Sequence, residues 1–220
     1  MRILHVRFNG LMSLFFAFIL VLTSLTFFSG QAAAKTRGEA VFGLCLQCHG
    51  AEGQGDKLYG APRIAGLPKW YILAQLEKFQ LGVRGKHPDD DAGNRMRPMA
   101  RTLADGDAEI VATYVANMKT PPGKPEGLTL VGGNVEKGKA LFMVCSACHG
   151  AGADGNEAMH APPLKISNDW YLLHQLMNFK NKIRASDPAK DPIGATMAPQ
   201  ASSLDEQAMK DVITYVQSLK

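Results

Sequence analysis

Residues 45–49 read Cys-Leu-Gln-Cys-His, and residues 145–149 read Cys-Ser-Ala-Cys-His. These two copies of one pattern contain all 4 cysteines of the 220-residue chain. Two thiols at this spacing can each bond a vinyl group of one haem, and the adjacent histidine then lies under the iron. The pattern therefore predicts two covalently attached haem c groups, with attachment at Cys45, Cys48, Cys145 and Cys148 and one axial ligand each from His49 and His149.

Disulfides, zinc and thiol redox chemistry are the competing uses of these cysteines. An exported chain could pair them as two disulfides. A zinc site would place its Cys-x-x-Cys pairs closer together or add paired histidines. A thioredoxin-like motif would need a βαβ context, which the sequence lacks. Both pairs are followed at once by histidine in equivalent contexts, and this repetition favours haem.

The first 34 residues are typical of a secretory signal peptide. Arg2 and Arg7 precede an apolar stretch at residues 11–28, and small residues then lead to Ala34. We expect export to the periplasm and cleavage after Ala34. The apolar stretch is close to the length that spans a bilayer, so an uncleaved membrane anchor is the alternative.

The charge balance argues against nucleic acid as a partner. The chain has 24 Lys and Arg against 20 Asp and Glu, and 2 of the basic residues lie in the N-terminal segment. Haem propionates would lower the small remaining positive charge further. A nucleic-acid-binding chain would instead carry a strong basic excess.

The chain is a duplication with an offset of 100 residues. The haem motifs coincide, and Ala61-Pro62 and Trp70-Tyr71 meet Ala161-Pro162 and Trp170-Tyr171. Self-similarity at one fixed period indicates repeated structural units, and this period is long enough for a whole small domain. We assign the domains to 35–119 and 134–220, with the Pro- and Gly-rich residues 120–133 as a stiff linker.

Each half is expected to contain three main helices and no strand. In the first half they run from about Gly38 into the haem motif, from near Pro68, and over roughly residues 105–118. The corresponding helices of the second half start near Val135, Asn168 and Asp205, of which the last two are suitable N-cap residues. Because each half alone makes a thin core, the haem should complete it.

The repeat also selects the second axial ligand of each iron. Methionine is the usual partner of histidine in electron-transfer sites. The first half offers Met96 and Met99, and the second half offers Met197. After a one-residue insertion in the second half, Met96 meets Met197 whereas Met99 meets Gln200, which could not do the same work. We therefore predict Met96 and Met197, each in a loop before the last helix of its half.

On these motifs the two halves resemble class I cytochrome c domains, and the tandem resembles the dihaem cytochrome c4 family. The resemblance implies an all-α fold, with each haem at the centre of about three helices. It also implies that Gly38 and Phe42 cross Tyr114, and that Gly138 and Phe142 cross Tyr215. The carbonyls of Pro62 and Pro162 should accept a hydrogen bond from the iron-bound histidine, and Trp70 and Trp170 are candidates for the haem surroundings.

The expected function is electron transfer, with one electron per haem and no substrate turned over. With both axial positions filled, no open iron remains for peroxide, so we expect neither catalytic residues nor a small-molecule substrate. The resemblance implies a donor and an acceptor protein among respiratory partners, a terminal oxidase among them, and association with the membrane surface. The alternatives are a cytochrome subunit of a dehydrogenase or oxidase complex, and a dihaem peroxidase.

Overall fold

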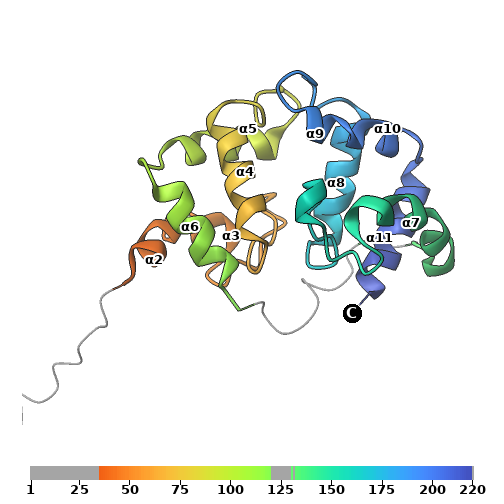
Figure 1. Ribbon diagram of the computed structural model, residues 1–220, viewed down its shortest axis with the longest axis horizontal. Coiled ribbons are helices and arrows are strands. Elements are labelled where there is room, and N and C mark those ends of the chain that lie inside the picture. Colours follow the sequence, from red (N-terminus) through yellow and green to blue (C-terminus); the bar gives the residue numbers. More distant parts are fainter. Residues whose placement is uncertain (1–34, 120–129, 131, 220) are drawn as a thin grey trace, which may run out of the picture. The chain divides into compact units, whose positions relative to one another are not determined.

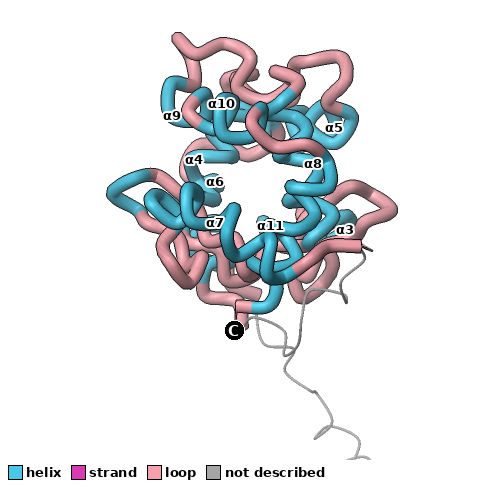
Figure 2. The backbone as a smooth tube through the Cα atoms, turned by 90° about the vertical axis from the view of Figure 1, so that its right-hand side faces the viewer, coloured by secondary structure: helices cyan, strands magenta, loops and turns pink. Residues whose placement is uncertain are grey.

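Helices are the regular elements of the part of the chain that this computed structural model describes, residues 35–119, 130 and 132–219. Figure 2 shows them joined by irregular loops, and β-type pairing in these residues is limited to the isolated bridges Asp56–Ala61 and Asn156–Ala161. The expected all-α fold is therefore confirmed. The signal peptide assigned to 1–34, and most of the linker assigned to 120–133, lie outside the described residues.

The first half of the chain contains five helices in its described part (Figure 1): α2 (Arg37–Phe42), α3 (Leu46–His49), α4 (Lys69–Gln80), α5 (Asp91–Arg101) and α6 (Asp107–Ala116). The first expected helix is divided, because the chain tightens into turns after α2. The N–H groups of Leu44 and Cys45 donate to carbonyls three residues earlier, at 3.1 and 2.8 Å. The other two expected helices are present as α4 and α6.

The second half repeats this order with α7 (Val135–His149), the 3-10 turn η1 (Glu157–Met159), α8 (Asp169–Lys180), α9 (Pro192–Ala195), α10 (Met197–Ser202) and α11 (Glu206–Ser218). Here the haem motif ends one continuous helix. Asp205 caps α11 as expected, since its side chain accepts from the N–H of Ala208 at 2.7 Å. Asn168 begins α8, but its side chain makes no cap bond.

The two predicted methionine ligands lie on helices, and the expectation of loops was wrong. Met96 is in the middle of α5, and Met197 is the first residue of α10. Asp90 caps α5, and Asp191 caps the short helix α9 that precedes α10. Each carboxylate accepts the N–H of the glycine three residues later. These caps offset the helix-breaking effect of the nearby prolines.

The first and last helices of each half cross through a glycine, as the family resemblance implies. The rings of Phe42 and Tyr114 lie 5.5 Å apart where α2 meets α6, and those of Phe142 and Tyr215 lie 5.5 Å apart where α7 meets α11. A Cβ on Gly138 would overlap the carbonyl oxygen of Asp211. Only glycine therefore permits the approach of these helices.

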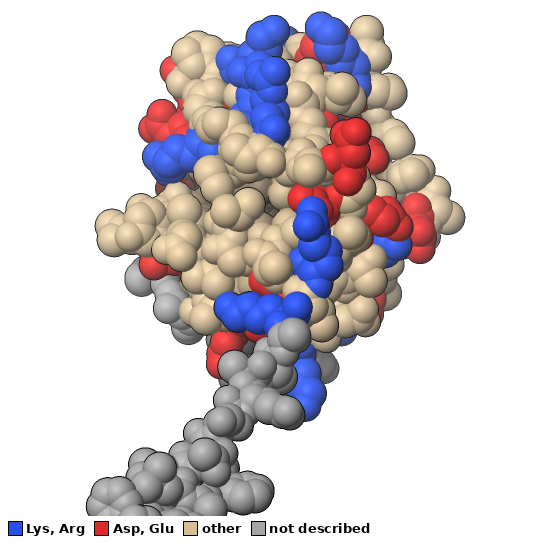
Figure 3. All heavy atoms as spheres, turned by 90° about the vertical axis from the view of Figure 1, so that its left-hand side faces the viewer, with Lys and Arg blue, Asp and Glu red and all other residues tan. Residues whose placement is uncertain are grey.

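The described residues from Thr36 to Leu219 belong to one compact unit. Its first half has one buried apolar cluster, whereas the second half has two separate clusters, around Phe142 and around Phe179. No helix in the described ranges combines the length and hydropathy needed to cross a bilayer. On the face in Figure 3, basic and acidic side chains are interspersed.

Replacing Gly138 by alanine tests the helix crossing. The added Cβ would meet the Asp211 carbonyl and lie 2.8 Å from the Tyr215 Cβ, so we expect G138A to lower the free energy of unfolding by about 1–3 kcal/mol. Denaturant unfolding of the haem-loaded protein measures this. K139A, at the exposed neighbouring position, should leave the midpoint unchanged. Equal midpoints for G138A and K139A would show that the helices can separate without cost.

Candidate haem-binding sites

The histidine of each haem motif is held by one hydrogen bond. Nδ1 of His49, the last residue of α3, lies 2.7 Å from the carbonyl oxygen of Pro62. Nδ1 of His149, the last residue of α7, lies 2.8 Å from the carbonyl oxygen of Pro162. Because a carbonyl only accepts, Nδ1 carries the proton and donates, and Nε2 keeps the lone pair that binds a metal. The hydrogen bond expected from the family resemblance is present in both halves.

A tight loop presents the Pro62 carbonyl to His49. The chain leaves α3 at Gly50, and the N–H of Gly55 donates to the His49 carbonyl at 2.8 Å. The Asp56–Ala61 bridge then brings Pro62 back. Gly55 has φ +88°, and a Cβ there would lie 2.5 Å from the Arg63 nitrogen. The loop therefore needs glycine both for its backbone angle and for space. Gly155 plays the same part in the second half.

Burial keeps both histidines in the form that binds iron. His49 and His149 are 8% and 6% exposed. This desolvation lowers the pKa of each imidazole, and the hydrogen bond to Pro62 or Pro162 offsets the shift only in part. The neutral imidazole is the metal-binding form.

No disulfide joins the four cysteines, all of which lie in the described residues. Cys45 and Cys145 are half-buried and pack against the apolar clusters, whereas Cys48 and Cys148 are exposed. Burial raises the pKa of Cys45 to about 11 and raises that of Cys145. Each pair thus has one sulfur at the core and one at the surface, which fits a flat ring inserted by its edge.

The methionines separate as the repeat predicts. Met96 and Met197 are partly buried and pack against apolar clusters. Met99 is 42% exposed, and its counterpart Gln200 is exposed as well. In the second half, Cys145 packs against the cluster around Phe142 and Met197 against the cluster around Phe179. In this half, the haem-attachment motif and the predicted methionine ligand therefore belong to different apolar clusters. Ligation of iron by Met96 and Met197 stays a prediction.

The tryptophans lie beside tyrosines at the start of α4 and α8. Trp70 and Tyr71 have ring centroids 5.7 Å apart, and Trp170 and Tyr171 are 6.0 Å apart. Trp70 also meets His160 of the second half edge-on, at 6.2 Å. Both tryptophans are partly buried. Their place in the haem surroundings stays a prediction.

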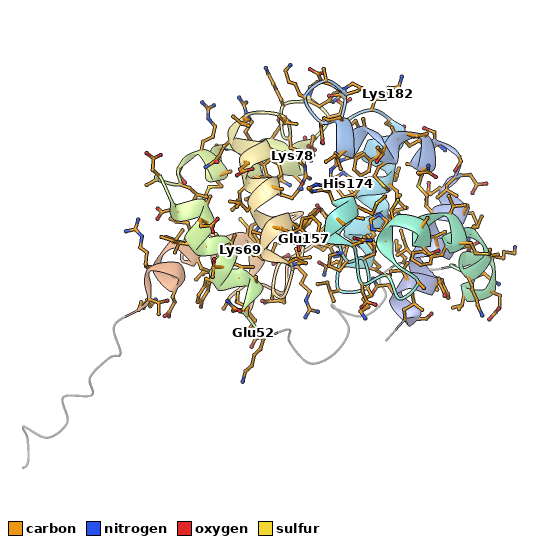
Figure 4. All side chains as sticks on the ribbon, viewed as in Figure 1. Glu52, Lys69, Lys78, Glu157, His174 and Lys182 are labelled. Carbon is orange, nitrogen blue, oxygen red and sulfur yellow. The ribbon has the colours of Figure 1, made fainter. Side chains whose placement is uncertain are left out.

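Sequence reasoning missed a reciprocal network between the halves. Arg84 donates to Gln75 at 2.8 Å and to Gln175 at 3.3 Å, while Arg184 donates to Gln175 at 2.7 Å and to Gln75 at 3.1 Å. Each guanidinium also lies over a phenylalanine ring of its own half. Lys78 of α4, labelled in Figure 4, adds an ion pair with Asp191 at 2.8 Å.

Buried nitrogen atoms show that this network accommodates a further group. The Nε atoms of Arg84 and Arg184 are buried and have no hydrogen-bond partner in the described ranges. An unmet buried donor is costly, so an acceptor belongs beside each of them. A haem brings two propionate carboxylates, which are suitable acceptors for guanidinium groups. The residues present therefore fit haem: paired thiols, an oriented imidazole, a thioether and a guanidinium in each half.

Replacing Gly55 by alanine tests whether the loop positions the imidazole. Gly55 and Gly106 both have positive φ, at +88° and +82°, so an alanine at either costs about 1–2 kcal/mol of backbone strain. Only at Gly55 does the Cβ also displace Arg63 and Pro62. We expect G55A to perturb the visible haem spectrum and to unfold earlier than G106A, which should keep the wild-type spectrum. Identical spectra would mean that His49 needs no support from this loop.

Comparison with known proteins places both halves in one family. The sequence profile of cytochrome c matches residues 35–119 and 135–220. Cytochrome c4 of Thiocapsa roseopersicina is 32% identical over 199 residues, which are 86% of this chain and 94% of that protein. The thiosulfate dehydrogenase electron acceptor of Thiomonas intermedia is 35% identical over 153 residues, 66% of each chain.

A solved structure agrees with this assignment. Cytochrome c4 of Acidithiobacillus ferrooxidans matches with a TM-score of 0.66 and 28% identity, over 81% of this chain and 99% of that one. The similarity to two-haem relatives thus extends over both halves and most of the length. The chain belongs to the dihaem cytochrome c4 family, in which tandem class I cytochrome c domains carry two covalent haem c groups and transfer electrons.

Proposed function

We propose that this protein is a periplasmic electron carrier between respiratory redox proteins, with one electron held at each haem. The iron of the first half would be bound by His49 and Met96, and that of the second half by His149 and Met197. The observation that carries this proposal is the repeated pairing of a proline-oriented imidazole with a partly buried methionine. The thioethers of Cys45, Cys48, Cys145 and Cys148 would fix the two rings.

The arrangement suits electron transfer rather than catalysis. When bound, each haem supplies a one-electron change at its iron. The histidine and the methionine that would bind each iron are held on separate elements, so the coordination geometry would stay the same in both oxidation states. With a histidine and a methionine bound to each iron, no axial position would remain for peroxide. This favours the carrier over the dihaem peroxidase.

A cytochrome subunit within a larger complex is the second candidate. The similarity to a thiosulfate dehydrogenase electron acceptor supports it, since that protein serves one enzyme. The haem chemistry would be the same, and a dedicated protein would replace a diffusing partner. Retention of a second protein during purification from membranes in mild detergent would favour this candidate, and N-terminal sequencing of the same sample would show whether residues 1–34 are removed.

Substitution of each methionine tests the proposed ligation. In the oxidised holoprotein, iron–methionine bonds give a far-red charge-transfer band. We expect M96A and M197A each to remove about half of this band and to turn one haem high-spin, because each opens one iron. M99A should retain the whole band, since Met99 is exposed and has no methionine counterpart.

The same spectra distinguish the alternatives. A wild-type protein with one high-spin and one low-spin ferric haem would support the peroxidase and contradict the carrier. Loss of the band in M99A, with the band intact in M96A, would reverse the assignment in the first half. Full oxidation and reduction of the wild-type protein should count two electrons per chain.

A further inference from the structure

Arg63 is a buried cation without a counter-charge. The residue is 3% exposed, and its Nε and Nη2 atoms have no hydrogen-bond partner among the residues that the structure describes. No ion pair joins it to an acidic side chain of the described ranges, and burial lowers the pKa of its guanidinium. It nevertheless stays charged, because arginine does not lose its proton in proteins. The residue directly follows Pro62, whose carbonyl holds His49.

The second half has no equivalent cation. Pro163 occupies the position that corresponds to Arg63, and it is buried as well. The position also differs in its backbone N–H group, and the residue that would accept from this group differs in the same way. The N–H of Arg63 donates to the side chain of Asn168 at 2.6 Å, and this bond is buried. Pro163 has no N–H to donate, and the counterpart of Asn168 is Pro68, which has no side-chain acceptor. The two halves therefore differ both at the donor position, 63 or 163, and at the acceptor position, 168 or 68.

A second arginine strengthens the difference. Arg97 follows the predicted ligand Met96, packs against Gly82 and Gly85, and has a buried Nε without a partner. Its counterpart in the second half is Ala198. The cations that appear only in the second half do not offset this, because they are paired or exposed. Lys165, Lys190 and Lys210 form ion pairs, and Lys139, Lys180 and Lys182 are exposed.

We propose that Arg63 sets the order of the two reduction potentials and makes the haem of the first half the more readily reduced. Ferric haem carries one more positive charge than ferrous haem, so a nearby buried cation disfavours the ferric form. Water screens this effect weakly at a site that is almost fully buried. Electrons entering the protein would then rest on the first haem. The proposal depends on the reversible one-electron sites proposed above.

The sign does not depend on whether Arg63 touches a propionate. If the guanidinium pairs with a haem carboxylate, it cancels a negative charge that would stabilise the ferric form. If it does not, its own charge destabilises that form directly. Removing the charge lowers the potential in both cases. Arg63 is thus a positioning and charge-setting residue rather than a ligand.

The experiment is a spectroelectrochemical titration of wild-type, R63Q and R63K holoprotein. The wild type should show two separate one-electron waves. R63Q should lower the potential of the higher wave. At a fixed potential the ratio of oxidised to reduced haem should rise roughly tenfold, which corresponds to about 59 mV for one electron. The lower wave should move much less. R63K, which keeps the charge, should stay near the wild type.

R95Q is the matched control. Arg95 lies in the same half on α5, but it is exposed and its Nη2 donates to the Tyr59 carbonyl. Solvent screens its charge, so neither wave should move. The proposal is overturned if R63Q moves the lower wave, moves both equally or moves neither, or if the wild type shows one merged wave. If the waves are not reversible one-electron steps, it is the carrier function that fails.

A transplant provides the converse test. P68N/P163R introduces the cation into the second half, together with the acceptor that its N–H would need. The lower wave should rise and the gap between the waves should narrow. A folded, fully haem-loaded P68N/P163R protein with an unchanged gap would contradict the proposal.

Discussion

The hydrogen bond from the histidine Nδ1–H to a proline carbonyl is the interaction on which each half depends. It fixes which nitrogen of the imidazole is free, and therefore where the metal must lie. The loop from Gly50 to Pro62, the positive φ of Gly55 and the short bridge at Asp56 all serve to present that one carbonyl. A buried imidazole without this acceptor would have an unmet donor and no preferred orientation. The second half has the same hydrogen bond, between His149 and Pro162, although several loop residues differ. The two halves therefore share the loop geometry more closely than the loop sequence.

The apolar core is arranged around the same constraint. In the second half it is divided into one cluster beside the proximal loop and another beside Met197. Neither cluster is large enough to hold a domain of this size together by itself. A covalent ring would complete the core, and the buried Nε atoms of Arg84 and Arg184 would be donors for its carboxylates.

Local signals and the repeat allowed most of the fold to be predicted from the sequence. Pro68 and Asp205 marked helix starts because their effect is local. Gly38 and Tyr114 could be paired through the family resemblance, and the offset between the halves separated Met96 from Met99. What failed depended on distant contacts. The network at Arg84 was missed because one of its partners, Gln175, lies 91 residues away. Asn168 suits a helix cap by type, yet its side chain is used by Arg63, 105 residues away. No local pattern carries that information.

The exchange of glutamines between Arg84 and Arg184 has a consequence for the origin of the molecule. Each arginine binds its own glutamine and that of the other half, which is the isologous pattern of a two-fold homodimer. In such a dimer every substitution appears on both sides, so a single Arg63–Asn168 contact could not exist without its mirror image. Fusing the two copies into one chain removes that restriction. The tandem arrangement thus permits one-sided contacts within a nearly symmetric interface, so the two sites need not be identical.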